Sequence, residues 1–220
     1  MYNAYRFVAI PAYRSRIWYS WKYSNLYHQF SNYTKLNRYP DLFEAARLYF
    51  ANQENIKILS FGCSTGEEVE SLSNYLPQAE IVGVDINLWC IEQAQKRYPQ
   101  HRFVHSLSPN FEALVGFDAI FCLAVFQNPA NRHDKEREIS AYAFSQFEKQ
   151  LSILDKKLKP NGLLFIDHCD FNFLELPLKN HYQIANIKQN MLVRNRPLFN
   201  KNNQKIAAIQ NNFRIFKKNN

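Results

Sequence analysis

The stretch Ile56-Lys-Ile-Leu-Ser-Phe-Gly-Cys-Ser-Thr-Gly-Glu-Glu68 decides the fold of this chain. An apolar run that ends at Phe61 leads into Gly62 and Gly66 and then into two glutamates. This order predicts a buried strand, a tight loop and the first turn of a helix. Glycine suits such a loop because it adopts positive φ at little cost and lets a ligand approach the backbone.

A second stretch, Glu80-Ile-Val-Gly-Val-Asp85, predicts a strand with a carboxylate at its carboxyl end. In doubly wound α/β folds, a glycine loop is followed roughly 20 residues later by such an acid, which accepts hydrogen bonds from ribose hydroxyls. We therefore expect the loop and Asp85 to hold a nucleoside.

The charge at the loop indicates which nucleoside. Dinucleotide-binding loops read G-x-G-x-x-G, whereas Gly62 and Gly66 are spaced G-x-x-x-G. Glu67 and Glu68 at the helix start would repel a pyrophosphate but suit a ligand with an ammonium group. S-adenosyl-L-methionine carries an α-amino group and a sulfonium and no phosphate, so the charge favours it over NAD.

The sequence resembles the class I S-adenosylmethionine-dependent methyltransferases over about residues 56–167, and the loop Gly62–Glu68 is especially similar to that of the chemotaxis receptor methyltransferases. Phe117–Phe126 resembles the fourth strand of the family and the segment after it, and Leu158–Asp167 resembles the fifth-strand signature. Each motif alone is weak, but four in this order and spacing are specific. The resemblance implies an α/β, Rossmann-like, seven-stranded, mostly parallel sheet with helices on both faces and an antiparallel last strand.

The alternation of strand and helix patterns along the chain favours the same architecture. A long helix is expected over about 136–158. Strands are expected over 56–61, 81–85, 102–105, 118–123, 163–167 and 213–217, and a strand that turns at an asparagine-rich loop is expected over 197–206.

Residues 1–50 differ in composition from the rest and hold nine of the 13 tyrosines. Helices are expected over 15–30 and 41–50. We expect residues 1–50 to form a helical, aromatic-rich N-terminal cap and residues 51–220 to form the S-adenosylmethionine-binding methyltransferase domain. Trp18, Trp21 and Tyr23 are expected to close the acceptor pocket over the carboxyl edge of the sheet. The alternative is that these rings only cover a helix outside the sheet.

The positive charge lies in the two flanks. Residues 1–50 carry a net charge of +5 and residues 171–220 carry +8, whereas residues 51–170 carry −5. Basic, aromatic flanks would attract an anionic substrate, including RNA. The alternative is a solvated surface whose aromatic rings pack on the sheet.

The chain shows no sign of a membrane span or a metal site. No apolar run approaches the ~20 residues of a span, and the N-terminus lacks a signal-peptide pattern. A chain of 220 residues that is 46% hydrophobic supports one sizeable core. We expect a cytoplasmic protein with no bound metal and no membrane partner. The cysteines lack metal-ligand spacing and are expected to be reduced core residues: Cys63, Cys90, Cys122 and Cys169.

The resemblance assigns cofactor roles within the loop. Gly66 lets the loop close into the helix, and Glu67 or Glu68 meets the amino group of the methionine portion. The alternative role of both acids is to stabilise the helix N-terminus, which contributes ~0.3–1 kcal/mol. The loop residues expected beneath the methionine and ribose portions are Gly62, Cys63 and Ser64.

The resemblance also assigns the nucleoside side of the pocket. Asp85 accepts hydrogen bonds from both ribose hydroxyls, and Ile86 covers one face of the adenine. Ser106 stands where many family members place an aspartate for the adenine amino group. Leu123 and Ala124 line the other side of the adenosine.

The methyl acceptor is less defined. Receptor methyltransferases carry an Arg-Asn pair where this chain has Leu123-Ala124, so methylation of a receptor glutamate is not expected. His105 lies at the end of the strand predicted over 102–105, and His168 follows the strand predicted over 163–167, so both are expected at the carboxyl edge of the sheet. Both are candidate general bases, and the alternative is that each has a structural role. Methyl transfer can also proceed by proximity alone.

These observations predict an S-adenosylmethionine-dependent methyltransferase that acts on an O or N nucleophile of a small or medium-sized acceptor. An RNA methyltransferase that uses the basic flanks is a second, less favoured hypothesis. A non-catalytic regulatory module that binds S-adenosylmethionine is a third. The sequence leaves the acceptor and the oligomeric state open.

Overall fold

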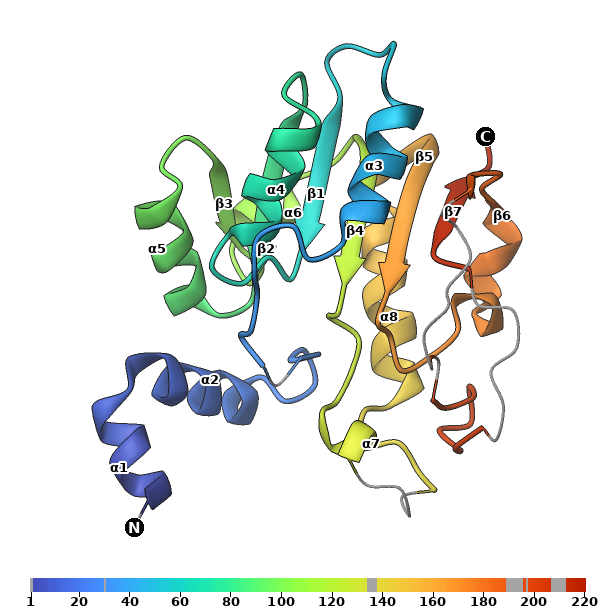
Figure 1. Cartoon of the computed structure of the whole chain (residues 1–220). Helices are drawn as coiled ribbons and strands as arrows, with labels where there is room; N and C mark the ends of the chain where they lie inside the picture. The colour runs from blue at the N-terminus through green and yellow to red at the C-terminus, as the bar shows by residue number, and fades with distance from the viewer. Residues whose placement is uncertain (1, 30, 134–137, 189–195, 197, 207–212) are drawn as a thin grey trace.

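The computed structural model describes residues 2–29, 31–133, 138–188, 196, 198–206 and 213–220 (Figure 1). Its centre is a seven-stranded sheet with the order β3-β2-β1-β4-β5-β7-β6. Strands β1 to β5 are parallel, whereas β7 is antiparallel to both β5 and β6. The strands are β1 (Lys57–Phe61), β2 (Glu80–Asp85), β3 (Arg102–His105), β4 (Phe117–Leu123), β5 (Leu158–Asp167), β6 (Tyr182–Ile184) and β7 (Ile215–Lys218).

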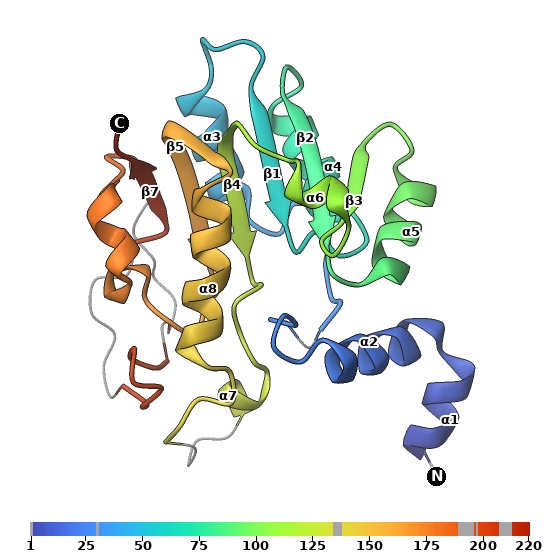
Figure 2. The same ribbon diagram turned by 180° about the vertical axis from the view of Figure 1, so that it is seen from behind.

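Helices cover both faces of this sheet. In Figure 1 the face toward the viewer carries α3, α4 and α5, and Figure 2 shows α6 and α8 on the opposite face. The expected Rossmann-like, mostly parallel sheet with an antiparallel seventh strand is therefore confirmed. The helices are α1 (Tyr2–Ala9), α2 (Pro11–Lys22), α3 (Pro40–Tyr49), α4 (Glu67–Tyr75), α5 (Leu88–Arg97), α6 (Pro109–Glu112), α7 (Ala130–His133) and α8 (Phe144–Asp155), with two short 3-10 turns, η1 (Phe173–Glu175) and η2 (Pro177–His181).

Alternating side chains of the central strands fill two separate cores. In β1, Leu59 and Phe61 pack into the core beneath α6 and α8, while Ile58 packs into the core beneath α3 and α4. On the second face, Phe121 of β4 and Phe165 of β5 stack with ring centroids 4.1 Å apart. Strands buried on both faces are typical of parallel sheets.

Several elements differ from the sequence expectation. The helix expected over 15–30 is α2, which ends at Lys22, and the chain then turns through residues 23–26. The long helix expected from residue 136 begins at Phe144; residues 136 and 137 lie outside the described part of the chain. β5 begins at Leu158 rather than Leu163, because Leu158 pairs with Phe117 before the register shifts. The strand expected over 197–206 is not part of the sheet: its described residues form a turn closed by an isolated bridge between Phe199 and Lys205, and the sixth strand is β6 instead.

Helix α3 packs on the sheet. Leu42, Phe43 and Ala46 are buried in the same core as Ile58 and Phe121. This packing favours a boundary between cap and domain near residue 39, earlier than the boundary at residue 50 that composition suggests. We propose that residues 1–39 are the cap.

The cap lies at the carboxyl ends of the central strands (Figures 1 and 2). Ser15 of α2 donates a 2.5 Å hydrogen bond to Asn87 Oδ1 at the start of α5. The Tyr19 ring meets the His105 ring edge-on at a centroid distance of 6.0 Å. Within the described residues, no helix combines the length and the apolar character needed to cross a membrane.

Candidate active site

A cavity of about 250 Å³ lies at the carboxyl edge of the sheet. Its walls come from the loop after β1, from the ends of β2 and β4, from the segment after β3, from α8 and from the cap. This is the edge at which open α/β sheets bind ligands. The cap residues in the wall are Leu26, Tyr27, His28, Gln29, Ser31, Asn32, Tyr33, Thr34, Lys35, Arg38 and Tyr39.

The loop after β1 has a conformation that requires glycine. Gly62 has φ of +78°, and a Cβ atom there would lie 2.4 Å from Cγ2 of Val125. The amides of Gly62 and Cys63 both donate to the Val84 carbonyl, at 2.7 and 3.0 Å. Gly66, at φ of +96°, precedes α4 and faces Tyr98 rather than the cavity. The loop therefore lies tightly between β2 and the segment after β4.

Asp85 lies in the cavity wall at the end of β2. Its Oδ2 accepts a 2.9 Å hydrogen bond from the Ser64 amide, and its Oδ1 accepts a 2.8 Å bond from the Asn87 amide. Burial raises the pKa of Asp85, and these amide bonds oppose the rise. A carboxylate oxygen has more than one acceptor site, so Asp85 can also accept from a ligand diol.

The structure distinguishes the two glutamates of the loop. Glu68 lies in the cavity wall and accepts a 2.8 Å hydrogen bond from Ser60 Oγ. Burial raises the pKa of Glu68 to about 7, against the Ser60 bond and the charge of Arg38. Glu67 instead pairs with Arg97 and accepts a 2.7 Å bond from Thr65 Oγ1, outside the cavity wall. Of the two loop glutamates, Glu68 is therefore the one that lies in the cavity wall.

Four expected contacts of the nucleoside also fall in the wall: Ile86, Ser106, Leu123 and Ala124. Ala124 has φ of +59°, and its carbonyl accepts a 2.8 Å hydrogen bond from Gln29 Nε2. This bond joins the segment after β4 to the cap.

Cys63 and Ser64 line the cavity as well. Burial and the nearby Asp85 charge raise the pKa of the Cys63 thiol well above its usual value, so this thiol stays protonated. Ser64 Oγ donates a 2.9 Å hydrogen bond to the Asn32 carbonyl and thereby links the loop to the cap.

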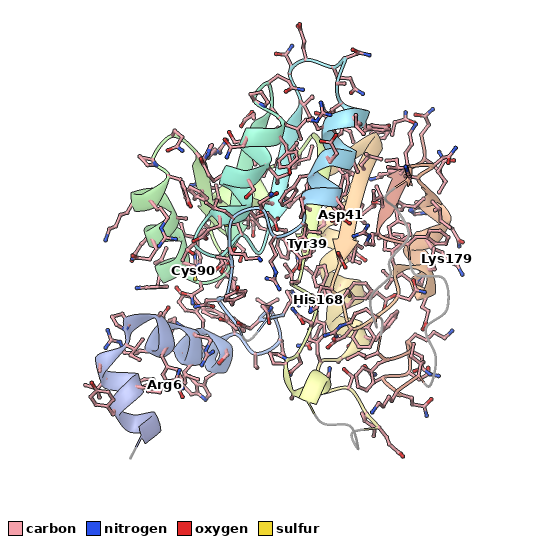
Figure 3. The ribbon with its side chains drawn as sticks, viewed as in Figure 1. Arg6, Tyr39, Asp41, Cys90, His168 and Lys179 are labelled. Atoms are coloured by element: carbon pink, nitrogen blue, oxygen red, sulfur yellow. The ribbon has the colours of Figure 1, made fainter. Side chains whose placement is uncertain are left out.

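Neither histidine proposed as a general base lines the cavity. His105 Nε2 donates a 2.8 Å hydrogen bond to the Ile86 carbonyl, so this nitrogen already has a partner within the protein. His168 follows β5 and lies beside Cys169 and Phe173 (Figure 3). The structure therefore does not bring these two side chains to the site.

The aromatic residues that the sequence places over the pocket are also elsewhere. Trp18, Trp21 and Tyr23 lie outside the cavity wall. Trp18 and Trp21 are exposed on α2, and Tyr23 stacks on Tyr19. The cap contributes instead through residues 26–39, because α2 ends before them and the chain then crosses the site.

Sequence reasoning missed a buried polar pair in the wall. His28 Nδ1 lies 2.5 Å from Tyr142 Oη, and its Nε2 lies 3.3 Å from Gln150 Oε1. Burial lowers the pKa of His28 to about 4, so the imidazole is neutral at neutral pH. Gln150 was detectable, because it is a polar residue among the buried positions Phe147, Leu151 and Leu154 of α8.

Two cations of the cap, Lys35 and Arg38, also line the cavity. The Arg38 guanidinium lies 5.3 Å from the Tyr39 ring centre and 5.6 Å from that of Tyr33. Burial raises the pKa of Glu68, and the positive charge of Arg38 partly offsets that rise. The cavity wall therefore places a cation and an acid near each other.

The fold and the glycine loop define a class of protein. The chain has the fold of the S-adenosylmethionine-dependent methyltransferases: it is similar to a TehB-like SAM-dependent methyltransferase from Corynebacterium glutamicum, with a TM-score of 0.52 and 17% identity, over 93% of this chain and 98% of that chain. More specifically, residues 59–164, just under half of the chain, match the family model described as a methyltransferase domain. This segment contains the loop, Asp85 and the segment after β4.

Curated relatives share shorter segments. A trans-aconitate 2-methyltransferase of Rhodopseudomonas palustris is 35% identical over 71 residues, which is 32% of this chain and 28% of that protein. A malonyl-[acyl-carrier protein] O-methyltransferase of Priestia megaterium is 33% identical over 131 residues, which is 58% of this chain and 42% of that protein. The chain thus matches less than half the length of either relative.

Proposed function

We propose that this chain is a methyltransferase that transfers a methyl group from S-adenosylmethionine to an oxygen or nitrogen nucleophile of a small or medium-sized acceptor. The observation that carries the proposal is the presence of Asp85 and Glu68 in the wall of one cavity, beside a loop that only glycine can form. The match of residues 59–164 to a methyltransferase domain supports it.

The residues present fit this cofactor. Asp85 suits the ribose hydroxyls, and Glu68 suits the α-ammonium group. Arg38, whose charge acts on Glu68, suits the carboxylate at the same end of the ligand. A pyrophosphate would meet three carboxylates in this wall, those of Glu68, Asp85 and Glu112, which argues against NAD. In this respect we propose that the loop works like that of the chemotaxis receptor methyltransferases, which it resembles.

When bound, S-adenosylmethionine supplies an electrophilic methyl group on a sulfonium sulfur. The task left to the protein is to hold the acceptor close, aligned and away from water. The cap residues of the wall provide the roof that excludes water, and Gln150, whose Oε1 is paired with His28, offers its amide group to an acceptor. We therefore propose catalysis by positioning, without a histidine base.

We favour an oxygen acceptor on a small carboxylic acid. Both curated relatives are named for acidic acceptors, trans-aconitate and a malonyl group. Lys35 adds a second positive charge to the wall, which would attract a carboxylate. The cavity, at about 250 Å³, is near the lower end of the ~300–1,000 Å³ typical of small-molecule sites.

The test is transfer of tritium-labelled methyl groups from S-adenosylmethionine to a panel of small acids, phenols and amines. We expect label in a small acid, released by mild base as an ester would be. Label in an added RNA fraction would favour the RNA methyltransferase that the basic flanks suggest. Cofactor binding with no labelled product from any fraction would favour a non-catalytic module.

We also propose a cytoplasmic location. All four cysteines are free and buried, as expected in a reducing compartment: Cys63, Cys90, Cys122 and Cys169.

A further inference from the structure

The outer side of α1 and α2 exposes large apolar side chains. On α2 and at its start, Ile10, Ile17 and Trp21 follow helical spacing and share one side, and Trp21 is 77% exposed. On α1, Val8 is 73% exposed and Tyr5 is 68% exposed. We call these five residues, together with Trp18, the leader face. Large apolar side chains exposed together on two consecutive helices indicate an interaction site.

The inner side of α2 is already occupied. Ser15 donates to Asn87 at the start of α5, and the buried Tyr19 ring contacts His105. The domain therefore fixes which side of α2 faces outward. Figures 1 and 2 agree that α1 and α2 lie beyond the carboxyl edge of the sheet, at the periphery of the molecule.

The leader face lies in a segment of one charge sign. Residues 1–40 contain six Lys or Arg and no Asp or Glu. Four of these cations belong to α1 and α2; Arg6, for example, lies on α1 (Figure 3), and Lys22 Nζ lies 4.6 Å from the Trp18 ring centre. Helices that lie in a membrane interface combine Lys and Arg with tryptophan and aliphatic side chains. α1 and α2 share this composition, and on α2 the cation Arg14 lies on the same side as Ile17 and Trp21.

We propose that the leader face docks on an anionic lipid bilayer surface. Helices of 8 and 12 residues are too short to span a bilayer but can lie in its interface. This contact departs from the expectation of no membrane partner, which rested on the lack of an apolar run long enough to span a bilayer. The proposal does not depend on the methyltransferase activity.

Two other partners fit the leader face less well. RNA would stack on Trp18 and Trp21, but Val8, Ile10 and Ile17 would gain nothing from bases or phosphates. A second copy of the chain, docked face to face, would bring cations against cations with no acid in either leader to neutralise them. A bilayer of anionic lipid supplies both hydrocarbon and negative charge.

Docking would hold the cavity close to the bilayer. The segment that follows α2 forms the cap wall of the cavity, so the helices on the leader face and the roof of the site are consecutive in the chain. An acceptor that partitions into the membrane interface would then enter near its binding site.

The test uses the full chain and sedimentation with vesicles of equal parts phosphatidylglycerol and phosphatidylcholine. We expect binding that weakens as salt rises and that is lost on pure phosphatidylcholine. Ile17→Ser with Trp21→Ser should reduce binding at least about tenfold, because two buried apolar side chains are lost. Removal of one cation by Arg14→Gln should reduce it roughly fivefold.

A matched control is Leu48→Ser on α3, which is 54% exposed and far from the leader in sequence; it should bind like the natural chain. A second readout uses Trp89→Phe, which leaves Trp18 and Trp21 as the tryptophans. Their emission should shift to the blue when vesicles are added and should not shift with phosphatidylcholine alone.

Several results would overturn the proposal. One is unchanged vesicle binding in the Ile17 and Trp21 double variant; another is no binding by the natural chain. Competition by a single-stranded RNA that abolishes vesicle binding and itself shifts the tryptophan emission would assign the leader face to RNA. Concentration-dependent dimers that the double variant abolishes, without vesicle binding, would assign it to a second copy.

Discussion

The Ser64 amide donates a 2.9 Å hydrogen bond to Oδ2 of Asp85, and this contact joins the loop after β1 to the end of β2. Ser64 has φ of +50°, which is uncommon for a residue with a Cβ. The bond therefore holds the loop in a strained conformation while leaving Asp85 in the cavity wall. One carboxylate therefore both shapes the loop and lines the cavity.

Replacing Asp85 should weaken cofactor binding. Asp85→Ala should lose roughly 1.5–3 kcal/mol of affinity for S-adenosylhomocysteine, the scale of hydrogen bonds to a charged group, as measured by calorimetry. A matched control is Asp118→Ala, because Asp118 also accepts a backbone amide, that of Lys57, but lies at the opposite edge of the sheet. Equal affinity in the Asp85 variant, with the fold confirmed by circular dichroism, would refute its role.

Enlarging Gly62 should displace the loop. Gly62→Ala places a Cβ 2.4 Å from Val125 at positive φ, so we expect a stability loss of ~1–3 kcal/mol beyond the backbone cost. Gly116→Ala is the control, because it has φ of +76° but its nearest neighbour is 3.8 Å away. The free energy of unfolding of Gly116→Ala should fall only by the cost of placing a Cβ at positive φ, about 1–2 kcal/mol. Urea unfolding measures both, and adding Val125→Ala should restore part of the Gly62 loss.

Glu68 should make stability fall as pH rises. Burial raises its pKa from 4.5 to about 7 in the folded chain. Between these values the folded state keeps a proton that the unfolded state releases, so ionisation of Glu68 destabilises the fold through this window. Glu68→Gln should remove that loss, and urea unfolding at several pH values measures the difference between the two proteins.

The same ionisation should help binding. An ammonium group prefers ionised Glu68, so affinity for S-adenosylhomocysteine should rise as pH passes through about 7 in the natural chain and stay flatter in Glu68→Gln. Parallel calorimetric curves for both proteins would contradict the assignment of Glu68 to the amino group.

Burial of His28 should make the stability of the fold decrease as pH falls, whereas Glu68 makes it decrease as pH rises. Burial lowers its pKa from 6.5 to about 4, so between these values the unfolded chain binds a proton that the folded chain does not. Its contribution to stability is therefore lost as pH falls through this window. His28→Gln should show a shallower loss of stability on acidification. If the free energy of unfolding of this variant falls between pH 6.5 and 4 as steeply as that of the natural chain, the ring is not buried in its neutral form.

The roof of the site should survive removal of the first two helices. Residues 26–39 have their own anchors, because Gln29 donates to Ala124, Ser64 donates to Asn32, and the Asn37 amide donates to Ser71. A chain lacking residues 1–25 should keep its affinity for S-adenosylhomocysteine, whereas one lacking residues 1–38 should lose acceptor methylation. If methylation persists without residues 1–38, the cap only packs on the domain and does not help to hold the acceptor.

The fold was predictable because its signals are local. The strand before Gly62 and the strand that ends at Asp85 can each be predicted from a few adjacent residues. The family resemblance that these motifs carry then implies the arrangement of the sheet. Nine of the 11 residues expected at the cofactor do line the cavity, because strand ends and the loop after β1 are determined by the fold. Gly66 and Glu67 differ because the helix start turns them toward Tyr98 and Arg97.

The cap was less predictable because its role depends on long-range contacts. His28 meets Tyr142 and Gln150, which lie more than 100 residues away in the sequence. The aromatic pattern of α2 indicated a helix but not which side faces the domain, so Trp18 and Trp21 were assigned to the site when the following segment lines it. His168 was placed at the correct edge but not at the cavity.

The most direct test of the central claim is a calorimetric titration of the full chain with S-adenosylhomocysteine and, separately, with NAD. We expect saturable binding of one molecule of S-adenosylhomocysteine per chain and no heat from NAD, because Asp85 and Glu68 line the same cavity. Binding of NAD, or no binding of S-adenosylhomocysteine to the folded chain, would contradict it.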